Sequence, residues 1–216
     1  MVHGYSALVL GSTGLVGQHL LEQLLKDEQY TSVTSLSRSM PMVDDASALT
    51  DKLNIVLSSL DNMADHQNVF DVDHVYVCLG TTIKQAGSKA QFKKVDHDYV
   101  VLAAQLAQAA QCKRFVWVSS VGADASSSSF YLRTKGKVEE TIMKLQTQSG
   151  NKTQFIHVNP SLLLGERDTF RLAETVAGYL GKWFGWLMIG PLRKYRPVHA
   201  SDVANWMRHP QQPTNG

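Results

Sequence analysis

The fold is decided by the stretch Gly11-Ser12-Thr13-Gly14-Leu15-Val16-Gly17. It follows a short apolar run, Ala7 to Leu10, and it opens a segment in which apolar residues recur at helical spacing. In such a turn the first glycine allows a tight bend, the second lets the backbone approach a pyrophosphate, and the third lets the helix pack closely on the strand. The exposed amides and the helix dipole would then hold the phosphates of a dinucleotide. A glycine-rich turn without a ligand is the alternative.

Apolar runs of strand length alternate with amphipathic segments from this turn to Pro160. We expect strands at Ala7–Leu10, Ser32–Leu36, Asn54–Leu57, His74–Leu79, Arg114–Val118 and Phe155–Val158. Helices are expected after the glycine turn, over Phe92–Ala110, with Val95, Tyr99, Leu102 and Leu106 facing the sheet, and over Tyr131–Gln146. This alternation predicts an α/β fold, a doubly wound parallel sheet of the Rossmann type. The serine-rich patch from Ala125 to Ser129 is expected to be a mobile loop.

Beyond Pro160 the alternation weakens into one helical segment, Thr169–Leu180, and a stretch rich in Gly, Trp and Pro. We expect a small C-terminal substrate lobe built mainly from residues 161–195, within a single domain of residues 1–209. Residues 210–216 have the composition of a frayed tail. The apolar segment Trp183–Ile189 is too short to span a bilayer. It could complete the core of the lobe, line a substrate pocket or form a dimer face.

Composition restricts the partners and the compartment. Of the 216 residues, 44% are hydrophobic, and the net charge of +2 is too small for a nucleic-acid surface. Cys78 and Cys112 lack CxxC spacing and are expected to be buried thiols, and the scattered histidines indicate no metal site. The first residues show none of the segments of a secretory signal peptide, so a cytoplasmic protein without membrane association is expected. A homodimer or a protein partner stays open.

The residues after the second strand bear on the type of cofactor. Folds that prefer NAD carry an acidic residue about 20 positions beyond the glycine turn, where it binds the ribose hydroxyls. This chain has Ser37-Arg38-Ser39 there instead. A guanidinium is suited to a 2′-phosphate, so NADP(H) is favoured, with NAD(H) as the alternative if Arg38 is only a solvated surface residue.

Three further residues form a candidate catalytic set. The fifth strand ends in Val118-Ser119-Ser120, and Tyr131 and Lys135 follow at helical i, i+4 spacing. An ammonium close to a phenol stabilises the phenolate, and a serine hydroxyl nearby can hold a substrate oxygen. YxxxK alone is common chance spacing, and a packing tyrosine beside a surface lysine is the alternative reading. The small polar segment Cys78-Leu79-Gly80-Thr81-Thr82 follows the fourth strand, where open parallel sheets bind ligands.

Together these motifs resemble the short-chain dehydrogenase/reductase superfamily, and within it the atypical NADP(H)-binding group. The resemblance covers nearly the whole chain, and it is most specific over Val118–Glu140, with support from Cys78–Thr82 and Arg196–Ala204. It implies a Rossmann fold and Ser120, Tyr131 and Lys135 as catalytic residues, with Lys135 also touching the nicotinamide ribose. Ser119 is the alternative if the register differs by one.

The complete set of expected cofactor contacts is Gly11, Ser12, Thr13, Gly14, Leu15, Val16, Gly17, Arg38, Leu60, Leu79, Gly80, Thr81, Tyr131 and Lys135. With them we expect an enzyme, an NADP(H)-dependent oxidoreductase that moves hydride between the nicotinamide and a small carbonyl or alcohol. Two alternatives stay open. One is an NADP(H)-sensing regulatory protein with little turnover, and the other is an enzyme like the sugar-nucleotide epimerases and dehydratases, which the short segment after Pro160 disfavours.

Overall fold

The structure is a computed structural model that describes residues 4–43, 51–148, 150–161, 163–164 and 197–210. These ranges contain all the predicted catalytic and cofactor-binding residues. The helix expected at Thr169–Leu180, the apolar segment Trp183–Ile189 and residues 211–216 of the tail lie outside them. So does most of the expected substrate lobe.

A six-stranded parallel sheet with the order β3-β2-β1-β4-β5-β6 forms the centre of the molecule. Its strands are β1 Tyr5–Leu10, β2 Tyr30–Ser37, β3 Leu53–Leu57, β4 His74–Val77, β5 Arg114–Val118 and β6 Gln154–Val158. The expected strands and the Rossmann fold are confirmed. β4 ends two residues earlier than expected, because the chain leaves the sheet once the Cys78 amide has bonded to the Leu10 carbonyl (2.8 Å).

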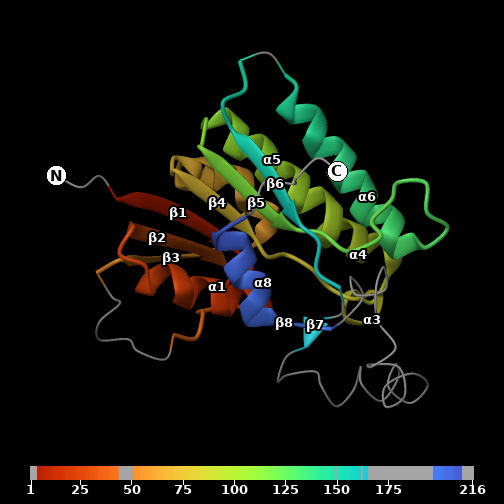
Figure 1. Ribbon diagram of the computed structural model, residues 1–216, viewed down its shortest axis with the longest axis horizontal. Coiled ribbons are helices and arrows are strands. Elements are labelled where there is room, and N and C mark those ends of the chain that lie inside the picture. Colours follow the sequence, from red (N-terminus) through yellow and green to blue (C-terminus); the bar gives the residue numbers. More distant parts are fainter. Residues whose placement is uncertain (1–3, 44–50, 149, 162, 165–196, 211–216) are drawn as a thin grey trace.

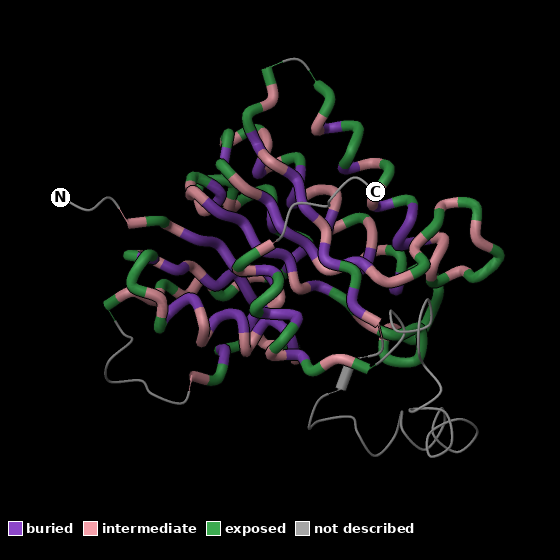
Figure 2. The backbone as a smooth tube through the Cα atoms, in the orientation of Figure 1, coloured by how far each residue is buried: buried purple, intermediate pink, exposed green. Residues whose placement is uncertain are grey.

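Helices cover both faces of this sheet, as Figure 1 shows. Helices α1 (Leu15–Lys26) and α8 (Ala200–Arg208) pack on one face. The opposite face carries α5 (Tyr99–Ala109), α6 (Phe130–Gln146) and the 3₁₀ segment η1 (Leu60–Phe70). Strand β1 serves both cores, because its side chains alternate between the two faces. The centre of the sheet is therefore buried on both sides: β1, β4 and β5 carry continuous runs of buried residues, whereas the edge strand β3 has none (Figure 2).

The long helix expected over Phe92–Ala110 is divided into three pieces. A short α4 (Lys89–Lys93) is followed by a π-helical turn, η2 (Lys94–Asp98), and then by α5. The buried face of α5 is displaced by about one residue from the face that the sequence predicted, so that prediction was wrong. Fully buried side chains on α5 are Val100, Ala103, Ala104 and Ala107, whereas Tyr99, Leu102 and Leu106 pack only at the margin of the core. The π turn changes the helical register, and the small alanines let α5 approach the sheet closely.

Shorter elements surround the carboxyl ends of the strands. Helix α3 (Ile83–Ala86) follows β4, and its N-cap Thr82 forms a capping box with Gln85. Two short strands, β7 (Leu163–Leu164) and β8 (Val198–His199), pair in parallel and bring the chain back to α8. Because all six central strands run parallel, the segments that follow them gather at one edge of the sheet.

The amino ends of the strands carry a polar and aromatic cluster. The Tyr30 hydroxyl lies 2.8 Å from His74 Nδ1 and 2.8 Å from the Tyr76 hydroxyl. Burial lowers the pKa of His74 to about 4, so this histidine is neutral in the folded protein near pH 7. Beside it, Asp73 accepts hydrogen bonds from the Ser6 amide and hydroxyl and pairs with Lys113. These contacts fix the starts of β1 and β4 against each other, opposite the edge where ligands are expected.

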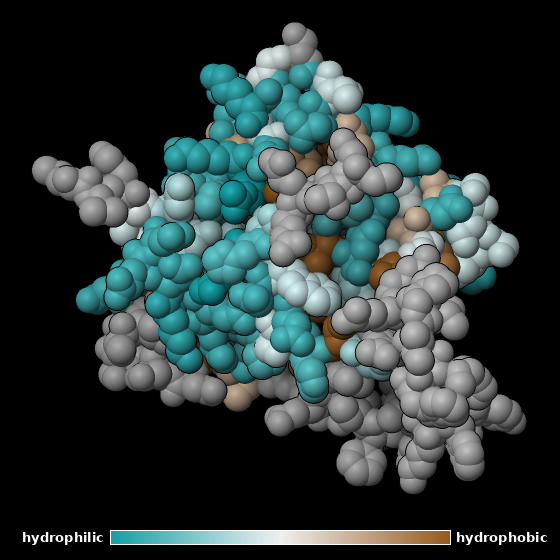
Figure 3. Space-filling view, viewed as in Figure 1, coloured by the Kyte–Doolittle hydropathy of each residue, from teal (hydrophilic) through white to brown (hydrophobic). Residues whose placement is uncertain are grey.

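The outer surface over α1 and α8 is mostly hydrophilic, with hydrophobic side chains showing only in small areas between the elements (Figure 3). Helix α8 buries Ala200, Val203, Ala204 and Met207 and turns its other residues outward. None of the helices in the described ranges combines the length and apolar character that crossing a membrane requires.

Candidate active site

The glycine turn places backbone against backbone between β1, β4 and α1. Gly11 has φ = +84°, and a Cβ there would lie 2.9 Å from the carbonyl carbon and oxygen of Cys78. A Cβ at Gly17 would collide with the carbonyl oxygen of Gly11. The Gly14 amide donates to that same oxygen at 3.0 Å. The first and third glycines of the motif are therefore required by the local geometry, as the sequence predicted.

The start of α1 is suited to a phosphate. Its N-cap is Gly14, which offers no side chain to the first amides, and the first turn contains no acidic residue. The side chain of Ser12 is buried and bonds to the Ser35 hydroxyl (2.7 Å), so this serine presents only its backbone to a ligand. The first amides of a helix lack intrahelical partners and carry a partial positive charge. These residues fit the pyrophosphate of a dinucleotide.

Arg38 and Leu60 follow the carboxyl ends of β2 and β3. Arg38 is exposed, next to Ser37, whose hydroxyl donates to the Ser39 carbonyl (2.7 Å). Leu60 is only 8% exposed and belongs to the core under η1, so its side chain serves packing first. Of these two predicted contacts, Arg38 is the one free to reach a charged group at the edge of the sheet.

Leu79, Gly80 and Thr81 form the turn that follows β4, beside the glycine turn. Leu79 is 7% exposed and points into the core, whereas Gly80 is exposed. The Thr81 amide donates to Asp96 Oδ2 (2.8 Å), which fixes the turn against η2. Strand order changes direction between β1 and β4, and open α/β sheets bind ligands in the crevice at this point.

Helix α6 brings Lys135 to the end of β5. The lysine is buried, and its Nζ lies 3.4 Å from the Val118 carbonyl oxygen, two residues before Ser120. The same ammonium lies 2.9 Å from Asp96 Oδ1, with side-chain exposures of 5% and 1% for the pair. A buried charge of this kind is tolerated only when it is paired. The surface-lysine alternative is thereby excluded for Lys135.

Asp96 is the residue that the sequence did not identify. Burial raises the pKa of the Asp96 carboxyl, while the Lys135 ammonium and the Thr81 amide oppose that rise. The sequence carried no distinct signal for it, because Asp96 lies in the charged run Lys93-Lys94-Val95-Asp96-His97-Asp98, which is typical of an exposed helix face. Its connection to Lys135 could not be recognised, because the π turn that places it was not expected.

The structure distinguishes the two serines at the end of β5. Ser119 is 3% exposed, and its hydroxyl donates to Glu139 on α6, which in turn lies near His157. Ser120 is partly exposed, and among the described residues its hydroxyl contacts the Val121 carbonyl oxygen at 3.3 Å. The Ser119 hydroxyl is therefore used to hold α6 through Glu139, whereas the partly exposed Ser120 hydroxyl can reach a ligand.

Tyr131 lies one helical turn before Lys135 and is 38% exposed. Its ring packs against buried Phe92 with centroids 5.8 Å apart, and Phe130 also packs against that phenylalanine at 5.7 Å. The Asp124–Ser129 loop precedes it. The sequence favoured a mobile loop, but Arg133 holds the carbonyl oxygens of Ser127 and Ser128. Tyr131 is thus positioned by an anchored loop and an aromatic neighbour.

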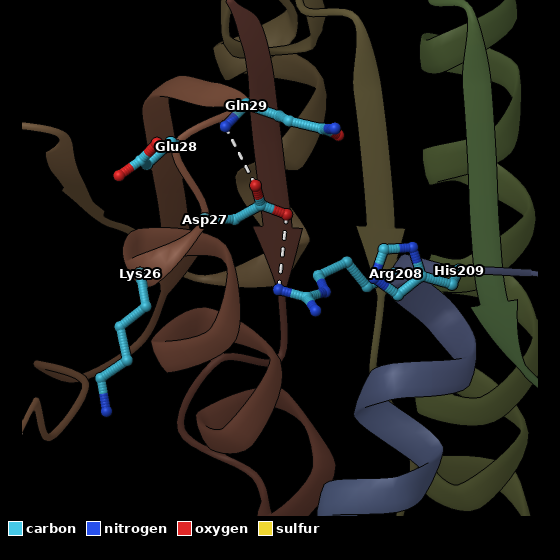
Figure 4. Close-up of a pocket in the computed structure, with 6 residues that line it drawn as sticks. All are labelled: Lys26, Asp27, Glu28, Gln29, Arg208 and His209. Carbon is cyan, nitrogen blue, oxygen red and sulfur yellow. Dashed lines mark hydrogen bonds and ion pairs between the residues drawn. The ribbon is translucent and has the colours of Figure 1, made fainter.

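A separate cleft is lined by Lys26, Asp27, Glu28, Gln29, Arg208 and His209 (Figure 4). It is formed where α1 and α8 both end, at the amino edge of the sheet. Asp27 occupies it by accepting from the Gln29 amide (2.9 Å) and by pairing with Arg208 (3.4 Å). This cleft joins two helix ends and holds none of the predicted catalytic or cofactor-binding residues.

Comparison with known proteins decides the family. A family model described as NAD(P)H-binding matches residues 11–169, which begin at the first glycine of the turn. The chain belongs to this NAD(P)H-binding family. The resemblance to the atypical short-chain dehydrogenases/reductases is confirmed, since the family model and the curated relatives agree with it.

Curated relatives include two fungal proteins and one mammalian protein. "Protein FMP52-1, mitochondrial" of Scheffersomyces stipitis is 36% identical over 76% of this chain and 70% of its own. "Protein FMP52, mitochondrial" of Candida albicans is 33% identical over 92% and 84%. "Protein HTATIP2" of Rattus norvegicus is 34% identical over 83% and 70%. They support an oxidoreductase-like NAD(P)-binding protein.

Solved structures with the same fold include "MoeE5 in complex with UDP-glucose and NAD", with a TM-score of 0.71 and 15% identity over 94% of this chain and 70% of that one. The UDP-glucose 4-epimerase of Thermotoga maritima gives a TM-score of 0.67 and 16% identity over 94% and 72%. At this identity the likeness establishes the Rossmann fold and nothing finer.

The expected compartment was wrong. Several relatives are named mitochondrial, and they point to the mitochondrion rather than the cytoplasm. A secretory signal bears only on export, and its absence from the first residues does not distinguish the cytoplasm from the mitochondrion.

The two serines give a prediction. We expect Ser120→Ala to lower kcat about 10²-fold, because it removes a donor to the substrate oxygen. Ser119→Ala should leave kcat within about twofold but destabilise the fold by about 1–3 kcal/mol, because Glu139 loses its buried donor. Steady-state kinetics and urea unfolding of both variants test this. A large loss of kcat in Ser119→Ala, together with a near wild-type kcat in Ser120→Ala, would contradict the choice of Ser120.

Proposed function

We propose that the protein is an NADP(H)-dependent oxidoreductase that reduces a small carbonyl compound or oxidises the corresponding alcohol. The observation that carries the proposal is the contact between Lys135 and the Val118 carbonyl oxygen. It fixes the helix that bears Tyr131 over the end of β5 that bears Ser120. This end lies at the same sheet edge as the glycine turn and the Gly80–Thr81 turn.

The surroundings of each residue determine the chemical role that we propose for it. Bound NADPH would supply the hydride that reduces the carbonyl carbon. The Tyr131 hydroxyl then donates its proton to the carbonyl oxygen, and the Ser120 hydroxyl holds that oxygen by a hydrogen bond. Lys135 binds the cofactor ribose and stabilises the phenolate that remains on Tyr131. A proton from solvent restores the tyrosine, and oxidation of an alcohol runs through the same steps in reverse.

The cofactor preference is part of the proposal. Arg38 is exposed at the end of β2, where the adenosine ribose of a dinucleotide bound at the glycine turn is expected. Its neighbours Ser37 and Ser39 bring no negative charge that would repel a phosphate. A guanidinium offers forked donors and a permanent charge to a 2′-phosphate. NADP(H) is therefore proposed over NAD(H).

Replacement of the tyrosine tests the catalytic role. We expect Tyr131→Phe to lower kcat about 10²- to 10⁴-fold, because the variant keeps the ring that packs on Phe92 and loses only the proton donor. NADPH oxidation is followed at 340 nm with a panel of aldehydes and quinones. The matched control is Tyr5→Phe, which removes a hydroxyl at the amino edge of the sheet from a residue as exposed as Tyr131 (37% against 38%) and should leave kcat unchanged. Equal rates in wild type and Tyr131→Phe would contradict catalysis by Tyr131.

Replacement of the arginine tests the cofactor preference. Hydrogen bonds to charged groups contribute about 1.5–3 kcal/mol, so Arg38→Ala should lower the NADPH-to-NADH affinity ratio about 10- to 100-fold. The ratio is measured by titration of the protein with each cofactor, followed by nucleotide fluorescence. Lys26→Ala removes a cation at the opposite edge of the sheet and serves as the control for net charge. An unchanged ratio in Arg38→Ala would remove this arginine from the cofactor site.

A further inference from the structure

Asp96 is a buried titratable group to which the proposed function gives no role. It is 1% exposed and lies in η2, the π-helical turn between α4 and α5. π turns are rare, and they occur most often at functional sites, because the inserted residue redirects a side chain that a regular helix would place elsewhere. Here the turn directs a carboxylate into the interior, at the carboxyl ends of β4 and β5.

The two oxygens of this carboxylate hold two different elements. Oδ1 lies 2.9 Å from the Lys135 ammonium on α6, and Oδ2 accepts the Thr81 amide at 2.8 Å. The carboxylate also lies against the backbone of the turn, since a Cβ at Gly80 would be 3.6 Å from Oδ1. One side chain therefore connects a turn predicted to contact the cofactor to the lysine predicted to bind the ribose.

The contacts of Lys135 leave part of its ammonium group available. An ammonium has three N–H donors. Within the ranges that the structure describes, Asp96 Oδ1 and the Val118 carbonyl oxygen, at 3.4 Å, are the acceptors found at Nζ. The third donor can serve a ligand at the carboxyl edge of the sheet. A lysine side chain has four rotatable bonds, so its orientation depends on these fixed acceptors.

We propose that Asp96 is a positioning residue of the active site, which holds the Lys135 ammonium beside the Gly80–Thr81 turn so that its remaining donor meets the cofactor ribose. The inference rests on the proposed function, because it takes Lys135 to be the ribose-binding lysine. It goes further in assigning the orientation of that lysine to one carboxylate. The competing explanation is that the ion pair only stabilises the packing of η2 on α6.

A double-mutant cycle separates these explanations. We expect Asp96→Asn, which removes the charge and keeps the size, to lower kcat about 10- to 100-fold and to weaken NADPH binding. In the Lys135→Met background the same change should alter kcat and the NADPH Kd by less than about twofold, because the group that Asp96 orients is already gone. Asp96→Asn with wild-type kcat and Kd, or effects that multiply in the double variant, would overturn the proposal.

Asp73 supplies a control at the opposite edge of the sheet. Its Oδ1 lies 2.8 Å from the Lys113 ammonium and its Oδ2 accepts the Ser6 amide at 2.8 Å, so its carboxylate also joins an ammonium to a backbone amide, in a more exposed pair (23% for Asp73 and 66% for Lys113). Asp73→Asn should lower Tm while leaving kcat and the NADPH Kd unchanged. If it lowered kcat as much as Asp96→Asn does, loss of packing alone would explain the result, and the positioning role would be overturned.

Two further measurements cover the remaining outcomes. If wild type reduces no carbonyl, the proposed function fails, and the NADPH Kd alone then tests Asp96: an unchanged Kd in Asp96→Asn overturns its role.

If Asp96→Asn does not fold, Asp96→Glu keeps the charge but displaces the ammonium by one methylene. We expect that variant to fold with a kcat and an NADPH affinity at least about threefold lower. Wild-type values for both would overturn the proposal.

Discussion

The approach of α1 to the turn that precedes it is so close that no side chain fits at residue 17. A Cβ there would meet the carbonyl oxygen of Gly11, and a Cβ at Gly11 would meet the backbone of Cys78. This contact of backbone with backbone lies where the strand order changes direction, between β1 and β4. It brings the first amides of α1 to the edge of the sheet, where they can hold a dinucleotide. The roles proposed for the other candidate residues depend on where these amides hold it.

The remaining parts of the candidate site are held by a small number of buried polar contacts. Asp96 links the Thr81 turn to Lys135, and Lys135 reaches the Val118 carbonyl oxygen at the end of β5. Ser119 contributes from the other side by binding Glu139 of the same helix. These directional contacts fix the register of α6, and they leave Ser120 and Tyr131 accessible.

The sequence predicted the fold well because its signals are local. Each strand is a short apolar run, and the glycine spacing follows from the steric demands of one turn. The pairing of Tyr131 with Lys135 on one helix face was also readable, because it depends only on i, i+4 spacing. The resemblance favoured Ser120 over Ser119, but the physical difference between the two serines depends on Glu139, which lies on a different element. The sequence did not reveal the role of Asp96, because its partners Thr81 and Lys135 also lie on different elements. A π turn, moreover, has no recognisable sequence pattern. The compartment was predicted wrongly, because the absence of a secretory signal does not distinguish the cytoplasm from the mitochondrion.

Hydrogen–deuterium exchange with and without NADPH tests the central claim most directly, because it reads the backbone amides that are assigned to the cofactor. The account predicts slower exchange at residues 11–17 and at Leu79–Thr81 when NADPH saturates the protein, with exchange around Tyr30 and His74 at the amino edge unchanged. Saturable NADPH binding without protection of the glycine turn would contradict the account, as would protection confined to the cleft between Lys26 and Arg208.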